Sequence, residues 1–269
     1  MTTLCEYNLI IENKYNINLK DKLGEGSFGV IYKGINRNTN KLVAIKIEDK
    51  SKSLLNNEAK IYNILNNING VPKLRSYGSV NCFNYMVIDY IGESLERYKL
   101  KNNSQLTLNN VKNIGLQIID IIEKIHNNGI IHRDIKPENF LIFKDKIYII
   151  DFGLSKLYIK NNKHVLKREI KDIIGNIRYS SIHIHNNISP SRRDDIESII
   201  YILIYLLNGS LPWGMSKNIK DIGNIKKDEN TFKKIKLNTN LLLLLKYVRE
   251  LKYSEKPNYN YIKNKINLL

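Results

Sequence analysis

The nine residues Ile131–Asn139, which read IHRDIKPEN, constrain this chain of 269 residues more than any other stretch. They place a carboxylate, a cation and an amide within one short loop. Asp134 can accept the proton of an attacking hydroxyl group, Lys136 can lie against a transferring phosphate, and Asn139 can hold a magnesium ion. This stretch, called the HRD loop below, therefore indicates the transfer of a phosphoryl group.

Three further motifs are compatible with that chemistry. Asp151-Phe152-Gly153 follows an apolar hairpin expected over residues 140–150, and Asp151 is a second metal carboxylate. Gly24-Glu25-Gly26-Ser27-Phe28-Gly29 can bring backbone N–H groups close to phosphates, because glycine has no Cβ to keep them away. Val43-Ala44-Ile45-Lys46 completes the set on an expected strand. Each motif alone could be an ordinary turn or strand end, but the four together, in this order, form a much stronger signal.

This order of motifs resembles that of a protein kinase. The resemblance implies an α+β, bilobal protein kinase fold, with a small, mainly antiparallel β lobe over residues 1–92 and a larger helical lobe over residues 93–269. The first lobe would end in a hinge at Tyr90-Ile91-Gly92, and the second would carry the catalytic loop and the activation segment, taken here as residues 151–183. The implied cofactors are ATP and Mg²⁺.

The resemblance also assigns roles to individual residues. Lys46 would contact the α- and β-phosphates and pair with Glu58, which lies twelve residues later on an expected helix. The alternative is that Glu58 belongs to a solvated helix face. Asp134, Lys136, Lys46 and Glu58 are the expected catalytic residues, and Asn139 and Asp151 the expected metal ligands.

A closer resemblance is to the casein kinase 1 family of serine/threonine kinases. It is carried by GNIRYSSIHIH at residues 175–185 and by SRRDDIESIIYILIYLLNGSLPW at residues 191–213. Shorter matches are EAKIY at residues 58–62, GESLE at 92–96 and EKPNY at 255–259. His183 is a departure, because that family has Asn at this position. The vaccinia-related kinases are the nearest competing subfamily.

By the same resemblance, a nucleotide site can be assigned residue by residue. Ile88 would be the gatekeeper beside the adenine, and Asp195 would anchor the backbone of the HRD loop. His132 would pack beneath Phe152. The expected cofactor-binding residues are Leu23, Gly24, Glu25, Gly26, Ser27, Phe28, Gly29, Ile31, Ala44, Lys46, Ile88, Leu141 and Ile150.

Hydrophobic periodicity predicts where the principal elements lie. Strands are expected over residues 18–47, interrupted by a turn at 36–40, and again over 74–79 and 85–89. Helices are expected over residues 55–66, 108–127, 196–207, 241–251 and 259–268. The region Gly214–Lys236 shows little resemblance to the casein kinase 1 family apart from its basic character. His183 and His185, if extended, would point the same way, but no Cys or third His accompanies them as a metal ligand.

Charge leaves other functions open. The chain has 43 Lys and Arg against 26 Asp and Glu, a net charge of +17, which favours anionic partners of any kind. A basic nucleic-acid-associated protein and a pseudokinase-like scaffold are therefore the alternatives to an active kinase. No nucleic-acid-binding motif accompanies the charge, however, and every expected catalytic residue is present.

We also expect an intracellular, soluble protein, cytoplasmic or nuclear, that acts as a monomer. Two cysteines cannot form a disulfide framework, which suits a reducing compartment. The N-terminus lacks the basic region of a signal peptide, and the apolar windows are too short to span a bilayer.

The activation segment gives two further expectations. No Ser or Thr lies between Ser155 and Ser180, so the usual activating phosphothreonine is impossible in this segment, and Arg133 must be held in another way. Arg178 matches the position that binds a substrate phosphate in the casein kinase 1 family. With the surrounding cations it predicts protein substrates with acidic or phosphorylated Ser/Thr sites. These cations are Lys160, Lys163, Lys167, Arg168 and Lys171.

Overall fold

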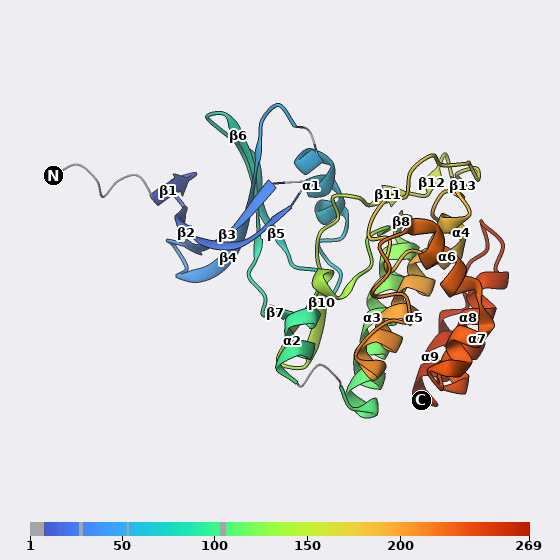
Figure 1. Ribbon diagram of the computed structural model, residues 1–269. Helices are drawn as coiled ribbons and strands as arrows, with labels where there is room; N and C mark the ends of the chain where they lie inside the picture. The colour runs from blue at the N-terminus through green and yellow to red at the C-terminus, as the bar shows by residue number, and fades with distance from the viewer. Residues whose placement is uncertain (1–7, 27–28, 53, 103–105) are drawn as a thin grey trace. The chain divides into compact units, whose positions relative to one another are not determined.

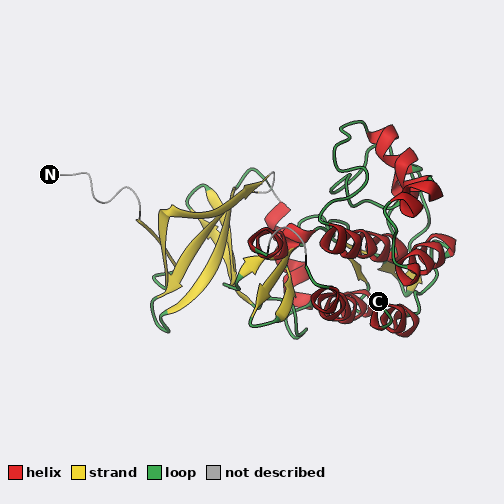
Figure 2. Ribbon diagram, turned by 60° about the horizontal axis from the view of Figure 1, so that its bottom comes forward, coloured by secondary structure: helices red, strands yellow, loops and turns green. Residues whose placement is uncertain are grey.

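The computed structural model describes residues 8–26, 29–52, 54–102 and 106–269. The chain separates into two compact units (Figures 1 and 2). The first contains Met1–Asn67 and Val71–Gly92, and the second contains Ile68–Gly70 and Glu93–Leu269. Strands dominate the first unit and helices the second, so the α+β class expected from the sequence is confirmed.

The first unit is built on a six-stranded antiparallel sheet in the order β1-β2-β3-β4-β6-β5. Its strands are β1 (Asn8–Ile11), β2 (Tyr15–Gly26), β3 (Gly29–Asn36), β4 (Lys41–Asp49), β5 (Leu74–Val80) and β6 (Phe83–Asp89). The turn expected at residues 36–40 joins β3 to β4, where the backbone N–H groups of Thr39 and Asn40 both donate to the carbonyl of Asn36. Asn40 tolerates the positive φ of 55° that this turn requires.

Alternating side chains of these strands form an apolar cluster, whose central members are Tyr15, Ile45 and Val87. The structure adds the hairpin of β1 with the start of β2, which the sequence pattern did not reveal. Helix α1 (Leu54–Ile64) packs Leu55, Ala59 and Ile61 inward. It ends two residues earlier than expected from the sequence.

Long helices form most of the second unit (Figure 1). Helix α3 (Leu108–Asn127) has the bounds that the sequence predicted, and Thr107 caps its N-terminus. Helix α5 (Arg192–Asn208) is buried on almost every side, as its apolar pattern indicated. The remaining helices are α2 (Leu95–Lys101), α4 (Ile182–His185), α6 (Ile219–Lys227), α7 (Glu229–Lys234), α8 (Thr239–Glu250) and α9 (Tyr259–Asn267).

Short strands complete the second unit, and the hairpin expected over residues 140–150 is confirmed. It consists of β9 (Phe140–Phe143) and β10 (Lys146–Ile149), joined by Lys144 and Asp145, both at positive φ. Strand β7 (Glu93–Ser94) extends this sheet. Two small pairs are β8 (Ile130–Ile131) with β11 (Lys156–Leu157), and β12 (Ile159–Lys160) with β13 (Lys163–His164). A 3₁₀ turn, η1, covers Pro137–Asn139.

Two regions differ from the sequence-based expectation. His183 and His185 lie on helix α4, not on an extended segment, and they face different partners. His183 Nε2 lies 3.1 Å from the carbonyl oxygen of Arg249, whereas His185 Nε2 lies 3.1 Å from Lys226 Nζ. Helices α6 and α7 occupy the region where no element was expected, because their ends are set by the caps Asn218 and Asp228 and not by a long apolar stripe.

Across the described ranges, no helix is both long enough and apolar enough to cross a lipid bilayer.

Candidate functional site

In the first unit, Lys46 of β4 and Glu58 of α1 form a buried ion pair. Lys46 Nζ lies 2.6 Å from Glu58 Oε2, and both side chains are less than a tenth exposed. Removing two charges from water costs much of what their attraction returns, so such a pair contributes more to position than to stability. The twelve-residue spacing seen in the sequence therefore corresponds to a direct contact.

The glycine-rich run lies where β2 ends and β3 begins. Gly29 has a φ of 124°, and a Cβ at this position would lie 2.3 Å from the carbonyl oxygen of Ile47. No other residue type fits there without moving the backbone. Gly24 has nothing within 4 Å of its Cβ position, so the backbone is open to a ligand on that side. Ser27 and Phe28, expected from the sequence to contribute to this site, lie outside the described residues.

Strand register places the first unit's expected nucleotide residues on one sheet face. Ile31 pairs with Lys46, and Ala44 pairs with Ile88. Because Ala44 and Lys46 are two residues apart on β4, all four side chains project from the same face. Leu23 of β2 is 45% exposed. Glu25 is also exposed, and its carboxylate pairs with Lys22.

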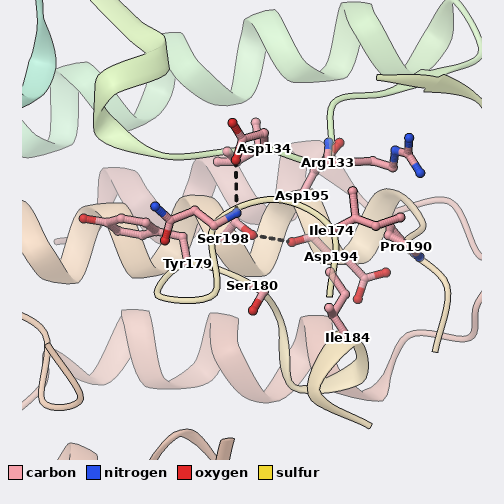
Figure 3. Close-up of a pocket in the computed structure, with 12 residues that line it drawn as sticks. Arg133, Asp134, Ile174, Tyr179, Ser180, Ile184, Pro190, Asp194, Asp195 and Ser198 are labelled. Carbon is pink, nitrogen blue, oxygen red and sulfur yellow. Dashed lines mark hydrogen bonds between the residues drawn. The ribbon is translucent and has the colours of Figure 1, made fainter. Parts of the chain in front are cut away.

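In the second unit, three donors surround the carboxylate of Asp134. Lys136 Nζ lies 2.7 Å and Asn139 Nδ2 3.0 Å from Asp134 Oδ2, while the backbone N–H of Asn176 donates to Oδ1 at 3.1 Å. Figure 3 draws the bond to Asp134 Oδ1 as a dashed line. The 3₁₀ turn η1 brings Lys136 and Asn139 back toward Asp134. This carboxylate is thus held in one orientation from both sides.

Asn139 and Asp151 suit a magnesium ion. The amide Nδ2 of Asn139 donates to Asp134. The Oδ1 atom of Asn139 therefore points away from the Asp134 carboxylate. The N–H of Ile150 donates to the carbonyl oxygen of Asn139 at 2.9 Å. This hydrogen bond holds the backbone just before Asp151 next to Asn139. Asp151 has a positive φ of 65°, an uncommon conformation that sites of function often retain. Amide and carboxylate oxygens are the ligands that Mg²⁺ prefers.

Asp195 of helix α5 anchors the HRD loop through its backbone. Its Oδ2 accepts from the N–H of His132 at 2.8 Å and its Oδ1 from the N–H of Arg133 at 3.0 Å. His126 Nε2 of α3 lies 2.9 Å from the same carboxylate. Several donors lower the pKa of Asp195 even though burial opposes this, so it stays charged. The anchoring role that the resemblance implied is what the geometry shows.

His132 packs against Phe152, with ring centroids 5.1 Å apart. Burial lowers the pKa of His132, which keeps its imidazole neutral. His132 therefore packs against Phe152, as expected from the sequence.

Arg133 is held without a phosphate. Its Nε donates to the carbonyl oxygen of Leu154 at 2.5 Å, and its backbone has a φ of 71°. Burial lowers the pKa of Arg133, but a guanidinium group stays charged in proteins at any physiological pH. The carbonyl oxygen of Leu154, in the activation segment, therefore accepts the hydrogen bond from Arg133 that a phosphate could otherwise accept.

Gly175, in the later part of the activation segment, packs closely against the backbone of the HRD loop. It has a φ of 86°, and a Cβ there would lie 2.4 Å from the carbonyl oxygen of Arg133. Beneath this contact lies a cavity of about 10 Å³, lined by Arg133, Asp134, Asp194 and Ser198 among others (Figure 3). It is close to the smallest space that can hold one water molecule. Little empty space is therefore left between the HRD loop and these residues of helix α5.

Arg178 has a fixed backbone and an exposed side chain. Its N–H donates to Asn176 Oδ1 at 2.9 Å, and its carbonyl oxygen accepts from Trp213 Nε1 at 2.7 Å. One guanidinium nitrogen lies 3.2 Å from the carbonyl oxygen of Gly214. No carboxylate lies within ion-pair distance of Arg178 in the described part of the chain.

The other five cations expected around the substrate share this property. Each is exposed, and among the described residues none forms an ion pair with an acid. They are Lys160, Lys163, Lys167, Arg168 and Lys171. By contrast, Arg75, Lys101 and Lys263 on other surfaces are each paired with an acid.

Sequence reasoning missed Lys226 of helix α6. Its side chain is fully buried, and Nζ donates to the carbonyl oxygens of Ile177 at 2.9 Å and Ser180 at 2.6 Å. Burial lowers the pKa of Lys226 to about 7. Burial, with the neighbouring Lys226 charge, likewise lowers the pKa of His185 to about 4. Lys226 thus supports the backbone on both sides of Arg178, a contact across nearly fifty residues that no local pattern could reveal.

The remaining expected residues are Leu141 of β9 and Ile150, which follows β10, both in the second unit. Comparison with known protein families matches residues 17–264 to the protein kinase domain. The matched segment covers nearly the whole chain, and both units contribute to it.

Proposed function

Because this chain belongs to the protein kinase family, we propose that it is a serine/threonine kinase, similar to casein kinase 1, that prefers acidic or already phosphorylated sites. The observation that carries this proposal is the contact of Lys136 Nζ with Asp134 Oδ2 at 2.7 Å. A lysine two residues after the base places a positive charge where the phosphoryl group would transfer to the hydroxyl of Ser or Thr. Tyrosine kinases have a different pattern at this point.

The residues of the HRD loop have separate roles in this proposal. Asp134 accepts the proton of the substrate hydroxyl, and its orientation is fixed by the N–H of Asn176 and by Asn139. Lys136 stabilises the charge that develops on the transferring group. Asn139 and Asp151 would hold Mg²⁺, which supplies the neutralising charge for phosphoryl transfer. Lys46, positioned by Glu58, would contact the nucleotide phosphates.

The preference for acidic substrates follows from the six cations of the activation segment, called the basic face below. These are Lys160, Lys163, Lys167, Arg168, Lys171 and Arg178. Their exposure and their lack of acidic partners within the described ranges leave their charge available to a ligand. Arg178 is the best placed for a phosphate, because its backbone is fixed and its planar guanidinium can form two parallel hydrogen bonds.

The test uses one peptide with Ser at the acceptor position and three variants of the residue three positions upstream. These carry phosphoserine, Asp or Ala. The wild-type protein should phosphorylate them in that order of kcat/KM, chiefly through KM, and the difference should shrink as salt concentration rises.

Arg178→Ala should remove most of the preference for the phosphoserine peptide and leave kcat on the Ala peptide unchanged. Lys160→Ala is the matched control, since it removes one charge of the basic face from an earlier part of the segment. If Arg178→Ala kept the full preference, or if basic peptides were better substrates, the proposed specificity would be wrong. Equal Mg²⁺-dependent phosphorylation by the wild type and by Asp151→Asn would contradict catalysis itself.

A further inference from the structure

The proposed function does not use the apolar side chains that lie among the cations of the basic face. Residues 156–168, called the hairpin segment below, include the strands β12 and β13 (Figure 1). In this segment Leu157 is 47%, Ile159 37% and Leu166 80% exposed. Single exposed apolar residues are common, but three so close together form a candidate contact surface.

The three apolar residues meet at one point of the hairpin segment. The N–H of Val165 donates to the carbonyl oxygen of Tyr158 at 2.8 Å. Leu157 and Ile159 are the two neighbours of Tyr158 in the chain, and Leu166 is a neighbour of Val165. Tyr158 is buried, and successive residues of an extended chain point to opposite sides, so its neighbours face outward. The exposed side chains therefore form one cluster.

The backbone of the hairpin segment is anchored at both ends. Tyr158 donates through its N–H to the carbonyl oxygen of Gly129 at 2.8 Å and through its hydroxyl to that of His126 at 2.7 Å. The N–H of Arg168 donates to Ser189 Oγ at 3.0 Å, and its carbonyl oxygen accepts from the N–H of Ser189 at 2.9 Å. The apolar side chains cannot turn inward without breaking these bonds, so the fold itself keeps them exposed.

The same segment carries only positive charge. Asn161 and Asn162 join its two strands with φ of 51° and 57°, as a tight hairpin turn requires. This turn places Lys160 directly opposite Lys163, and like charges in such a pair repel. The segment contains no acid and five cations, which are Lys156, Lys160, Lys163, Lys167 and Arg168. Negative charges on a partner would relieve the repulsion.

An anionic lipid surface suits this combination better than other anionic partners. It takes up aliphatic side chains at the boundary of headgroups and acyl chains, and its headgroups attract Lys and Arg. Nucleic acid favours stacking aromatic side chains, but Tyr158, the only Tyr, Phe or Trp of the segment, is buried. Protein interfaces favour a broader patch with aromatic anchors.

We propose that the hairpin segment binds the surface of an anionic lipid bilayer, with Leu157, Ile159 and Leu166 between the headgroups and the acyl chains. The lysines of the turn lie against the lipid phosphates, and the net charge of +17 adds attraction at longer range. Arg178 lies outside the segment, with its guanidinium against the carbonyl oxygen of Gly214. The proposal goes beyond the proposed function, because it concerns where the protein binds and not what it phosphorylates.

The test is co-sedimentation with vesicles of two compositions. Vesicles of phosphatidylcholine with about a third phosphatidylserine should bind the protein about tenfold more tightly than vesicles of phosphatidylcholine alone. The difference should shrink as salt concentration rises. Equal binding to both vesicles would overturn the proposal. So would failure to bind the anionic vesicles by protein that still binds the phosphoserine peptide, and this result would leave the proposed function intact.

Leu166→Asn tests the apolar contribution without changing the charge. It should weaken binding to the anionic vesicles by about fivefold to tenfold and keep the salt dependence. Leu268→Asn is the matched control, because Leu268 is 65% exposed at the end of helix α9, outside the hairpin segment. Unchanged binding by Leu166→Asn, or equal weakening in the two variants, would contradict the proposal.

The double variant Lys160→Gln, Lys163→Gln tests the charge of the turn. It should weaken binding to the anionic vesicles by about tenfold and flatten the salt dependence. The control is Lys233→Gln, Lys234→Gln, which removes two exposed charges from helix α7. Equal losses in the two proteins would show that net charge, and not the hairpin segment, attracts the lipid.

Leu166→Trp reports directly on insertion. The chain has one other Trp, Trp213, which is buried, so emission from an exposed indole comes from position 166. This emission should shift to shorter wavelength on anionic vesicles and be quenched by lipids with brominated acyl chains. Unchanged emission from vesicle-bound protein would place the segment outside the membrane and overturn the proposal.

Discussion

The HRD loop and the basic face lie in the same unit but handle charge in opposite ways. In the HRD loop, Arg133, Asp134 and Lys136 are at least partly buried. The Arg133 guanidinium donates to the carbonyl oxygen of Leu154 at 2.5 Å, and Lys136 Nζ lies 2.7 Å from Asp134 Oδ2. On the basic face the cations are exposed, and none has an acidic partner among the described residues. Charges that are hydrogen-bonded in a buried loop fix geometry and are screened little by salt, whereas unpaired surface charges attract ligands and are screened strongly. The first region is therefore preorganised for chemistry, and the second is available for recognition.

Asp134→Asn gives the largest expected effect. The amide keeps the shape of the side chain but cannot accept a proton from the substrate, so kcat should fall by about 10³-fold. The melting temperature should change little, since the amide oxygen can still accept from Asn176 N–H. Steady-state kinetics and thermal unfolding, measured side by side, check both parts.

The matched control for that variant is Lys171→Gln, which removes a charge from the basic face. It should change KM for an acidic peptide and leave kcat intact. A large fall in the melting temperature of Asp134→Asn would mean that the residue is structural, and the contrast between the two regions would fail.

Gly175→Ala tests how closely the two regions are joined. The new Cβ would collide with the carbonyl oxygen of Arg133, next to Asp134, so kcat should fall by at least about tenfold. Strain at positive φ should also lower the free energy of unfolding by about 1–2 kcal/mol.

Gly129→Ala separates those two effects. Gly129 also has a positive φ, of 75°, but its nearest neighbours would lie 3.6 Å or more from a Cβ. In a denaturant titration it should show the loss of stability that comes from the positive φ alone, with kcat close to wild type. Equal kcat in the two alanine variants would show that the contact of Gly175 with the HRD loop does not matter for catalysis.

Lys226→Met tests the buried support of the basic face through pH. The pKa of Lys226 is about 7 in the folded chain and near 10.5 when exposed, so the unfolded chain binds more protons between these values. The free energy of unfolding of the wild type should therefore gain a positive contribution as pH rises from 7 toward 9. Lys226→Met lacks this contribution, and its stability should rise less over the same range.

Lys227→Met is the control, because Lys227 is the exposed neighbour on the same helix. Urea titrations at pH 7, 8 and 9 give the three slopes. A slope for Lys226→Met equal to that of the other two proteins would mean that Lys226 is not a low-pKa group.

The smallest expected effect is that of removing phosphate groups. Arg133 already donates to the carbonyl oxygen of Leu154, and no Ser or Thr lies between Ser155 and Ser180. Protein made in bacteria and treated with phosphatase should therefore keep its activity to within about tenfold, or 1.4 kcal/mol of barrier. A larger loss would show that a phosphate elsewhere orders the HRD loop.

How much the sequence could predict depended on the range of each interaction. The contacts of Asp134 with Lys136 and Asn139 are local, and their spacing in the chain indicated them directly. Helix α3 could be delimited to the residue because Thr107 caps a clear apolar stripe. The separation of Lys46 and Glu58 by a strand and a helix could be inferred only from the resemblance to kinases.

Long-range contacts were harder to predict. Lys226 lies in a basic stretch that is typical of a solvated helix, and only the fold shows that it is buried beneath Ile177 and Ser180. Glu48 likewise looks like an exposed strand residue until the start of α1 is placed against it. The hairpin of β1 was missed because its four residues carry too short a pattern to distinguish a strand.

The bonds to Asp195 have a consequence for the slow motions of the second unit. The amide protons of His132 and Arg133 are both covered by one carboxylate of helix α5, which also contacts His126 of α3. These two protons can exchange with solvent only when the HRD loop leaves α5. Native-state hydrogen exchange should therefore place them in the same cooperative unfolding unit as the core of α3 and α5, far more protected than loop amides usually are. Motions of the HRD loop that preserve activity are then limited to its side chains. The backbone of the loop unfolds only together with helices α3 and α5.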